Sequence, residues 1–129
     1  MDDFGTRKHA SLKDKLAAES VVERVYLAVE QLCTGQGDVR KRLEAAVLTL
    51  LPLQVREFPE CVQEDFDWVI RESMKYKSQY PQFRGDLEAT MMRIRNSTGQ
   101  KIAQRIFHIY SSIQNIRGFP LLEYRGHDE

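Results

Sequence analysis

Apolar residues recur along this chain at the three- and four-residue spacing of an amphipathic helix. Between Leu12 and Ile116 the pattern is interrupted by turn and proline signals, but never by a strand-like alternation of any length. This spacing places apolar side chains on one side of a helix, and such a stripe is stabilised by burial against another stripe. The sequence therefore predicts an all-α fold: a single-domain bundle of four to five helices, mostly antiparallel.

Two helices are predicted before Pro52. Ser11 is placed to cap the first helix, which extends to about Cys33. Its apolar stripe comprises Ala18, Val22, Val25, Val29 and Leu32. The two glycines of residues 34–37 end it, because glycine adopts left-handed backbone at no steric cost. Asp38 is then placed to cap a second helix, which Pro52 ends or kinks. The second stripe comprises Val39, Leu43, Ala46, Val47 and Leu50.

Two further helices are predicted after a short turn or connector at residues 53–58. Pro59 suits the first position of the third helix, where its missing N–H would have had no partner, and this helix should end near Ser78. Its inner face comprises Val62, Phe66, Val69, Ile70, Ser73 and Met74, with Trp68 beside them. Residues 80–85 read as a loop, and Asp86 is placed to cap a fourth helix. The fourth stripe comprises Leu87, Met91 and Ile94.

Residues 96–100 allow two interpretations. In one long helix from residue 86 to residue 114, the apolar residues before and after this segment would stay on the same side. A break is favoured, because Gly99 weakens a helix and Ser97 with Gln100 matches a capping box. In a continuous helix Arg95 would also lie close to the centre of the buried stripe, which is unfavourable for a charge without a partner.

The last helix carries the most regular pattern in the chain, and Gly118 should end it. Its five isoleucines, at spacings of four, three, four and three, are Ile102, Ile106, Ile109, Ile113 and Ile116. Such regularity is typical of a seam between helices. The stripe is expected to pack inside the bundle; the alternative is a contact with a second copy of the chain.

Length and composition agree with one globular domain. The 129 residues are 42% hydrophobic and 29% charged, and 19 basic side chains balance 19 acidic ones. We expect the bundle to span residues 11–124, with tails at 1–10 and 125–129. No apolar run is long enough to cross a membrane, and the acidic start is unlike a signal peptide, so a cytoplasmic location is expected.

The sequence contains no evident arrangement of residues that is typical of a catalytic or metal-binding site. The histidines at positions 9, 108 and 127 lack metal-ligand spacing, and no cofactor or metal is expected. Cys33 and Cys61 are expected to be reduced core or half-buried thiols. The acidic side chains Glu57, Glu60, Glu64 and Asp67 can share a helix face, which we interpret as solvated rather than cation-binding. Arg105 and His108, three residues apart, resemble an arrangement of small helical ribonucleases only weakly, and the chain is predicted not to be an enzyme.

Charge is distributed unevenly along the chain. Residues 56–72 contain six acidic and two basic side chains, whereas residues 84–117 contain six basic and two acidic ones. In an antiparallel bundle, side chains of these two segments could form ion pairs at the surface, and each pair would add about a few tenths of a kcal/mol to the stability. The alternative is that the basic half is a docking surface. Cations alternate with aromatic side chains around residues 75–84, as at protein interfaces and single-stranded nucleic-acid sites.

Two functions are carried forward. The first is a non-enzymatic protein-binding or regulatory module that acts through a protein partner or through its own homodimer. The second is a helical bundle that binds nucleic acid, or cleaves RNA, with the basic surface of residues 84–117. The candidate partner-binding residues are Tyr80, Phe83, Arg84, Arg93, Arg95, Lys101 and Arg105.

Overall fold

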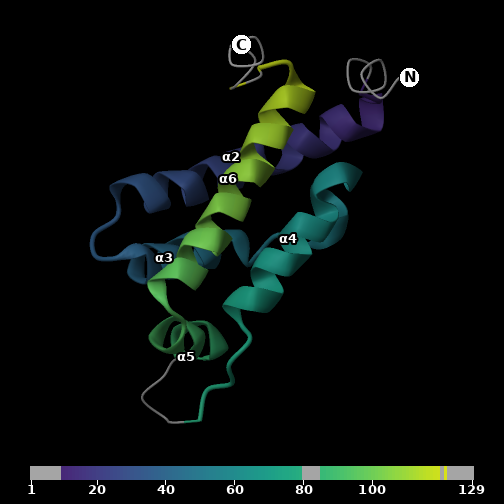
Figure 1. Cartoon of the computed structure of the whole chain (residues 1–129). Coiled ribbons are helices and arrows are strands. Elements are labelled where there is room, and N and C mark those ends of the chain that lie inside the picture. Colours follow the sequence, from purple (N-terminus) through teal and green to yellow (C-terminus); the bar gives the residue numbers. More distant parts are fainter. Residues whose placement is uncertain (1–9, 80–84, 120, 122–129) are drawn as a thin grey trace.

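The computed structural model describes residues 10–79, 85–119 and 121 of the chain. Within these residues the chain forms α-helices and one short 3-10 turn, η1 (Val55–Glu57), and no strand (Figure 1). The helices are α2 (Leu12–Thr34), α3 (Val39–Leu50), α4 (Glu60–Ser73), α5 (Asp86–Arg93) and α6 (Asn96–Arg117). The predicted all-α bundle is confirmed. The expected tails fall almost entirely outside the described residues.

α6 is the central helix of the bundle (Figure 1). It packs on α2, α3 and α4; α2 and α3 also pack on each other, and α5 packs on α3 and α4. α2 runs antiparallel to α6, because Glu19 near the start of α2 accepts a hydrogen bond from Arg117 at the end of α6, at 2.8 Å. α6 therefore has two flanks, one against α2 and one against α4, and the candidate sites lie on these flanks.

The isoleucine stripe of α6 forms the centre of the core. Ile102, Ile106, Ile109 and Ile113 are at most 2% exposed, and Ile116 is packed against the same cluster. These side chains are covered by the chain's own helices, so the interpretation as internal core is confirmed. The alternative interpretation, in which this stripe contacts a second copy of the chain, is therefore wrong.

The buried face of α2 differs from the predicted one by a small rotation. Ala18, Val25 and Leu32 are buried as expected. Val22 and Val29 are only half-buried, and the adjacent positions Val21 and Ala28 take the central places. Two of the five residues of the predicted stripe thus lie at the edge of the buried face of α2 rather than in the core.

Side-chain caps begin the first two helices as predicted. Ser11 Oγ accepts from the Asp14 amide at 3.0 Å, and Asp38 accepts from the amides of Arg40 and Lys41 at 3.0 and 3.3 Å. The two glycines between these helices play different roles. Gly37 has a φ of +91°, whereas Gly35 has a φ of −69° and donates to the Gln31 carbonyl. A Cβ on Gly35 would lie 2.6 Å from that oxygen, so this glycine is required by close approach and not by left-handed backbone.

The third helix ends earlier than predicted, at Ser73 rather than near Ser78. Beyond it, the backbone amides of Tyr76 and Ser78 donate to Thr90 Oγ1 and Asp86 Oδ1, both at 2.9 Å. These bonds to α5 replace the helical bonds that a longer α4 would have made. They also correct the expected role of Asp86. It is the first residue of α5, with Gly85 at the N-cap position, and its carboxylate holds the preceding segment.

The helix break near residues 96–100 is confirmed, but it lies at Ile94 and Arg95, which have extended backbone. The Arg40 guanidinium donates to the Ile94 carbonyl at 3.1 Å, and the Arg95 side chain is exposed, away from the buried stripe. The expected Ser97 capping box is wrong, because the N-cap position is Arg95. Gly99 is buried inside α6, and a Cβ there would lie 3.1 Å from Val39 Cγ1. This glycine allows α6 to approach α3 closely.

Both cysteines are free thiols, as predicted, but both residues are exposed and neither lies in the core, although its surroundings partly desolvate the Cys61 thiol. Cys33 lies in the last turn of α2 and Cys61 in the first turn of α4. Partial burial, with the nearby Asp14 carboxylate as the next cause, raises the pKa of the Cys61 thiol above its ordinary value. Cys61 is therefore held in the less reactive thiol form.

Candidate functional site

The predicted basic surface is only partly available to a ligand. Tyr80, Phe83 and Arg84 lie outside the described residues. The four other candidates belong to α5, to the break and to α6, and they do not form one open patch. They are Arg93, Arg95, Lys101 and Arg105.

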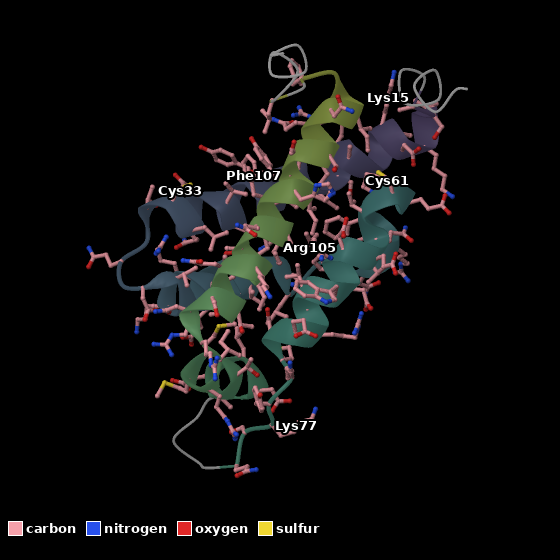
Figure 2. All side chains as sticks on the ribbon, viewed as in Figure 1. Lys15, Cys33, Cys61, Lys77, Arg105 and Phe107 are labelled. Carbon is pink, nitrogen blue, oxygen red and sulfur yellow. The ribbon has the colours of Figure 1, made fainter. Side chains whose placement is uncertain are left out.

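Arg105 is bound to the α4 flank of the same molecule. Its guanidinium donates to Asp65 Oδ1 at 3.1 Å and lies over the Trp68 ring, 4.3 Å from the ring centre. His108 Nε2 lies 3.7 Å from the other Asp65 oxygen. Figure 2 shows Arg105 on the side of α6 that faces α4. The acidic and basic segments therefore do meet, and the Arg105–His108 spacing brings both side chains to one carboxylate.

The other three basic candidates differ in how they are held. Arg93 lies over the Tyr76 ring, with its guanidinium carbon 4.5 Å from the ring centre. Arg95 and Lys101 are exposed and form no ion pair with any residue of the described ranges. Two of the four cations are thus committed to neighbours within the bundle, and two remain open to solvent.

Two of the four acidic side chains predicted to share a face, Asp67 and Glu57, have local partners. Asp67 accepts from Arg71 one turn further along α4, at 2.9 Å. Glu57 accepts from the Gln54 amide at 3.3 Å and so closes the η1 turn. In the described part of the chain, no three His, Cys, Asp or Glu side chains are grouped in a way that could hold a metal ion.

The most distinctive surface feature is an apolar groove between α2 and α6, with a volume of about 360 Å³. Val29 and Cys33 form the α2 wall, and Ala103 and Phe107 form the α6 wall. Arg42 of α3 also lines the groove. Figure 2 shows Phe107 on the side of α6 opposite Arg105, near the end of α2 that carries Cys33.

Three aromatic side chains extend this apolar surface along the same flank. Tyr26 and Tyr110 face each other with ring centres 6.2 Å apart, and Phe107 lies 6.4 Å from Tyr110. Phe107 is 42% exposed and Tyr26 is 47% exposed. We call this surface the aromatic groove and define it by Tyr26, Val29, Cys33, Arg42, Phe107 and Tyr110.

Among the residues that the structure describes, Arg42 is the only charged one that lines the groove. Its Nη1 donates to the Leu32 carbonyl at 2.6 Å, and its Nε donates to the Gly37 carbonyl at 3.1 Å. Both acceptors are neutral, and they lie in the last turn of α2 and in the loop that follows. A cation suits this position because helix carbonyl dipoles converge there. The guanidinium is nevertheless not neutralised by a carboxylate of the described residues.

The face of α6 above the groove is uncharged. The sequence contains no Asp or Glu between Glu88 and Glu123. At helical spacing, Gln100, Gln104, Phe107 and Ser111 share one face of α6, and the first three are exposed. An uncharged surface with an aromatic centre is unusual in a chain in which 29% of residues are charged.

A second hollow, of about 620 Å³, lies between α3 and α5. Met91 and Met92 line it together with charged side chains of both signs, among them Lys41, Glu44 and Glu88. Its many charged side chains favour a solvated cleft, whereas the aromatic groove exposes apolar atoms that water solvates poorly.

The aromatic groove was missed by sequence reasoning, although a signal for it exists. Val22, Tyr26, Val29 and Cys33 follow one another at spacings of four, three and four, along the edge of the buried α2 stripe. Phe107 and Tyr110 lie similarly beside the isoleucine stripe of α6. An apolar stripe wider than one core face indicates an uncovered flank.

The described helices include none that is long and apolar enough to span a membrane. Comparisons with models of protein families, with curated proteins and with solved structures found no match to this chain.

Proposed function

We propose that this chain is a non-enzymatic protein-binding module that docks an acidic amphipathic helix of a partner protein in the aromatic groove. The observation that carries the proposal is the groove itself. The exposed Phe107 lines an apolar hollow that continues toward the exposed Tyr26, whereas other exposed apolar side chains, such as Leu16 and Leu48, line neither of the two hollows.

Aromatic side chains at a groove are the residues most often responsible for binding energy in protein interfaces. Phe107 and Tyr26 expose large apolar surfaces, and neighbouring rings at 6.2 and 6.4 Å restrict Tyr110 between them. Preorganised rings lose little conformational entropy when a partner binds. These features support docking by apolar contact.

The shape of the groove favours a helix as its occupant. Its two walls are antiparallel helices, α2 and α6, whose lining residues recur at helical spacing. A third helix can lay its own ridge of side chains between two such walls. The partner helix would then complete a local three-helix arrangement.

Charge favours a partner protein over a second copy of this chain. Within the described parts of the chain, the groove lining contains one cation, Arg42, and no acidic side chain. In a twofold dimer the same patch meets itself, so neither copy's lining would offer Arg42 a carboxylate. A partner helix with acidic residues beside its apolar face satisfies both the apolar walls and the cation.

A displayed library of helical peptides tests this proposal with the unmodified chain as target. We expect enrichment of helices that carry large apolar residues at i, i+4 and i+7, with net negative charge. Phe107→Asp should weaken their binding at least about tenfold, the loss of roughly 1.4 kcal/mol that one aromatic anchor supplies. Leu48→Asp is the matched control, because Leu48 is an exposed apolar residue outside the groove lining.

Three results would overturn the proposal. One is the absence of helix enrichment, and another is enrichment of helices whose binding Phe107→Asp and Leu48→Asp change equally. The third is concentration-dependent self-association in sedimentation that Phe107→Asp abolishes, which would assign the groove to a second copy. Melting curves from circular dichroism verify that both variants are folded before binding is measured.

Single-stranded nucleic acid is the second candidate partner, supported by the exposed and unpaired Arg95 and Lys101. Phosphate contacts by such cations release counterions, so binding to a labelled single-stranded RNA should weaken with added salt. Substituting both residues by Ala should then reduce the affinity and the salt dependence together. Unchanged binding in this double variant would exclude the candidate surface.

A further inference from the structure

We infer that Arg42 makes one end of the aromatic groove selective for a carboxylate that lies beside a large apolar group. In the docked helix this group would be an Asp or Glu one turn from the apolar anchor residue. The inference rests on the proposed function and assigns the specificity of the same site.

The Arg42 guanidinium is held in one orientation by the protein. Its Nε and Nη1 donate to the carbonyls of Gly37 and Leu32 at 3.1 and 2.6 Å. A guanidinium has five N–H donors, so these two bonds leave Nη2 and one Nη1 hydrogen for a ligand. Because the side chain is already ordered, a carboxylate that binds it pays little additional conformational entropy.

Neither of the two acidic residues close to Arg42 in the sequence lines the aromatic groove: Glu44 lines the hollow between α3 and α5, and Asp38, one turn before Arg42, is committed elsewhere. Asp38 Oδ2 lies 3.0 Å from Arg40 Nη2, and its Oδ1 accepts from the first amides of α3. The bond from Arg40, reinforced by the Lys41 amide, holds the pKa of Asp38 below its ordinary value, so this carboxylate stays charged and paired. Arg42 therefore lies beside apolar walls with backbone carbonyls as its partners, and no carboxylate of the described residues pairs with it.

The rest of the lining determines what accompanies the carboxylate. Val29, Ala103 and Phe107 offer apolar contacts, and Gln104 and Cys33 add a side-chain amide and a thiol to the groove. A volume of about 360 Å³ accommodates one large aliphatic or aromatic group. With one cation, the site suits a single carboxylate better than a phosphate, which usually recruits several basic groups.

Two small probes of equal shape test the inference on the whole chain. 4-Phenylbutyrate carries an aromatic ring and a carboxylate, and 4-phenylbutyramide replaces the carboxylate by a neutral amide. Titration of each into isotope-labelled protein, followed by NMR, yields both affinities and the residues that respond. We expect the carboxylate to bind about tenfold more tightly, with shifts around Arg42 and Phe107 and a preference that decreases with added salt.

Variants of two arginines separate recognition from folding. Arg42→Gln should abolish the preference for the carboxylate while leaving amide binding intact, and Arg42→Lys should retain part of it. Arg24→Gln is the matched control, because Arg24 also links α2 to α3 through a backbone carbonyl, that of Thr49 at 3.2 Å, but does not line the groove. If Arg42→Gln does not fold, the comparison of the two probes on the unmodified chain and on Arg42→Lys still decides the question.

The outcomes distinguish this inference from the proposed function. Equal affinities for the two probes, no response to either at millimolar concentrations, or an unchanged preference in Arg42→Gln would each overturn the carboxylate site. Helices from the display library that bind through Phe107 would, in any of these cases, leave the docking function standing. A helix whose binding survives replacement of all its acidic residues by Gln would overturn the inference at the level of the partner as well.

Discussion

Two adjacent residues of α6, Ile106 and Phe107, should affect stability and binding in opposite ways. Ile106 is fully buried in the core, whereas Phe107 is 42% exposed at the aromatic groove. Ile106→Ala removes three buried carbons, worth about 2.4 kcal/mol at about 0.8 kcal/mol each. The cavity left behind raises the expected loss of unfolding free energy to about 3–4 kcal/mol, within the observed range for such substitutions.

Phe107→Ala should lower the unfolding free energy by roughly 1 kcal/mol or less, because much of the ring is already in water. The ring contacts Tyr110 and the groove, so the same variant should lose most of its affinity for the selected helices. Ile106→Ala, while folded, should retain that affinity.

Urea denaturation followed by circular dichroism measures these differences, with each variant examined at two protein concentrations. A small effect of Ile106→Ala, comparable with that of Phe107→Ala, would refute the assignment of the isoleucine stripe to the core of one chain. A midpoint of the unmodified protein that rises with concentration would refute it as well, since it indicates that unfolding is coupled to dissociation of a dimer.

Three other predictions follow from particular contacts. Gly99→Val should destabilise the protein by about 1–3 kcal/mol in the same urea assay, because even a Cβ would lie 3.1 Å from Val39 and α3 must shift to admit the larger side chain. The pKa of Asp38 is lower in the folded state than its ordinary value of 3.8. The stability that this carboxylate confers is therefore present above pH 3.8 and is lost as the pH falls through the lower pKa of the folded state. In Asp38→Ala, the unfolding free energy should therefore decrease less steeply as the pH is lowered through the acid range. Alkylation near neutral pH, followed by mass spectrometry, should modify Cys33 faster than Cys61, because partial burial raises the pKa of the Cys61 thiol. 4-Phenylbutyrate should protect Cys33 alone, since only Cys33 of the two lines the groove. Equal rates for the two cysteines would contradict this prediction.

Much of the fold was predictable because it depends on local spacing and on caps. The α3 stripe from Val39 to Leu50 is buried as predicted, and Ser11 and Asp38 cap their helices. Where the prediction failed, a long-range contact replaced a local signal. α4 stops at Ser73 because amides beyond it donate to α5, and the break lies at Ile94, where Arg40 binds the carbonyl.

The candidate site was predictable only in part. The sequence indicated that Arg105 belongs to a basic segment opposed by an acidic one, and the structure pairs it with Asp65. It did not indicate that Arg105 would lie flat on Trp68, since that contact joins residues of two helices. The aromatic groove depends on the angle between α2 and α6, which no repeat within either helix specifies.

Helix periodicity and capping act between residues a few positions apart, so the all-α bundle could be deduced from the order of residues alone. Which flank of each stripe is covered depends on how the helices pack against one another. Ile106 and Phe107 are neighbours in the chain, yet packing buries the first and leaves the second beside Arg42 in an open groove. Burial and electrostatic pairing are properties of the assembled surfaces, and the docking site that we propose exists only when three helices have come together.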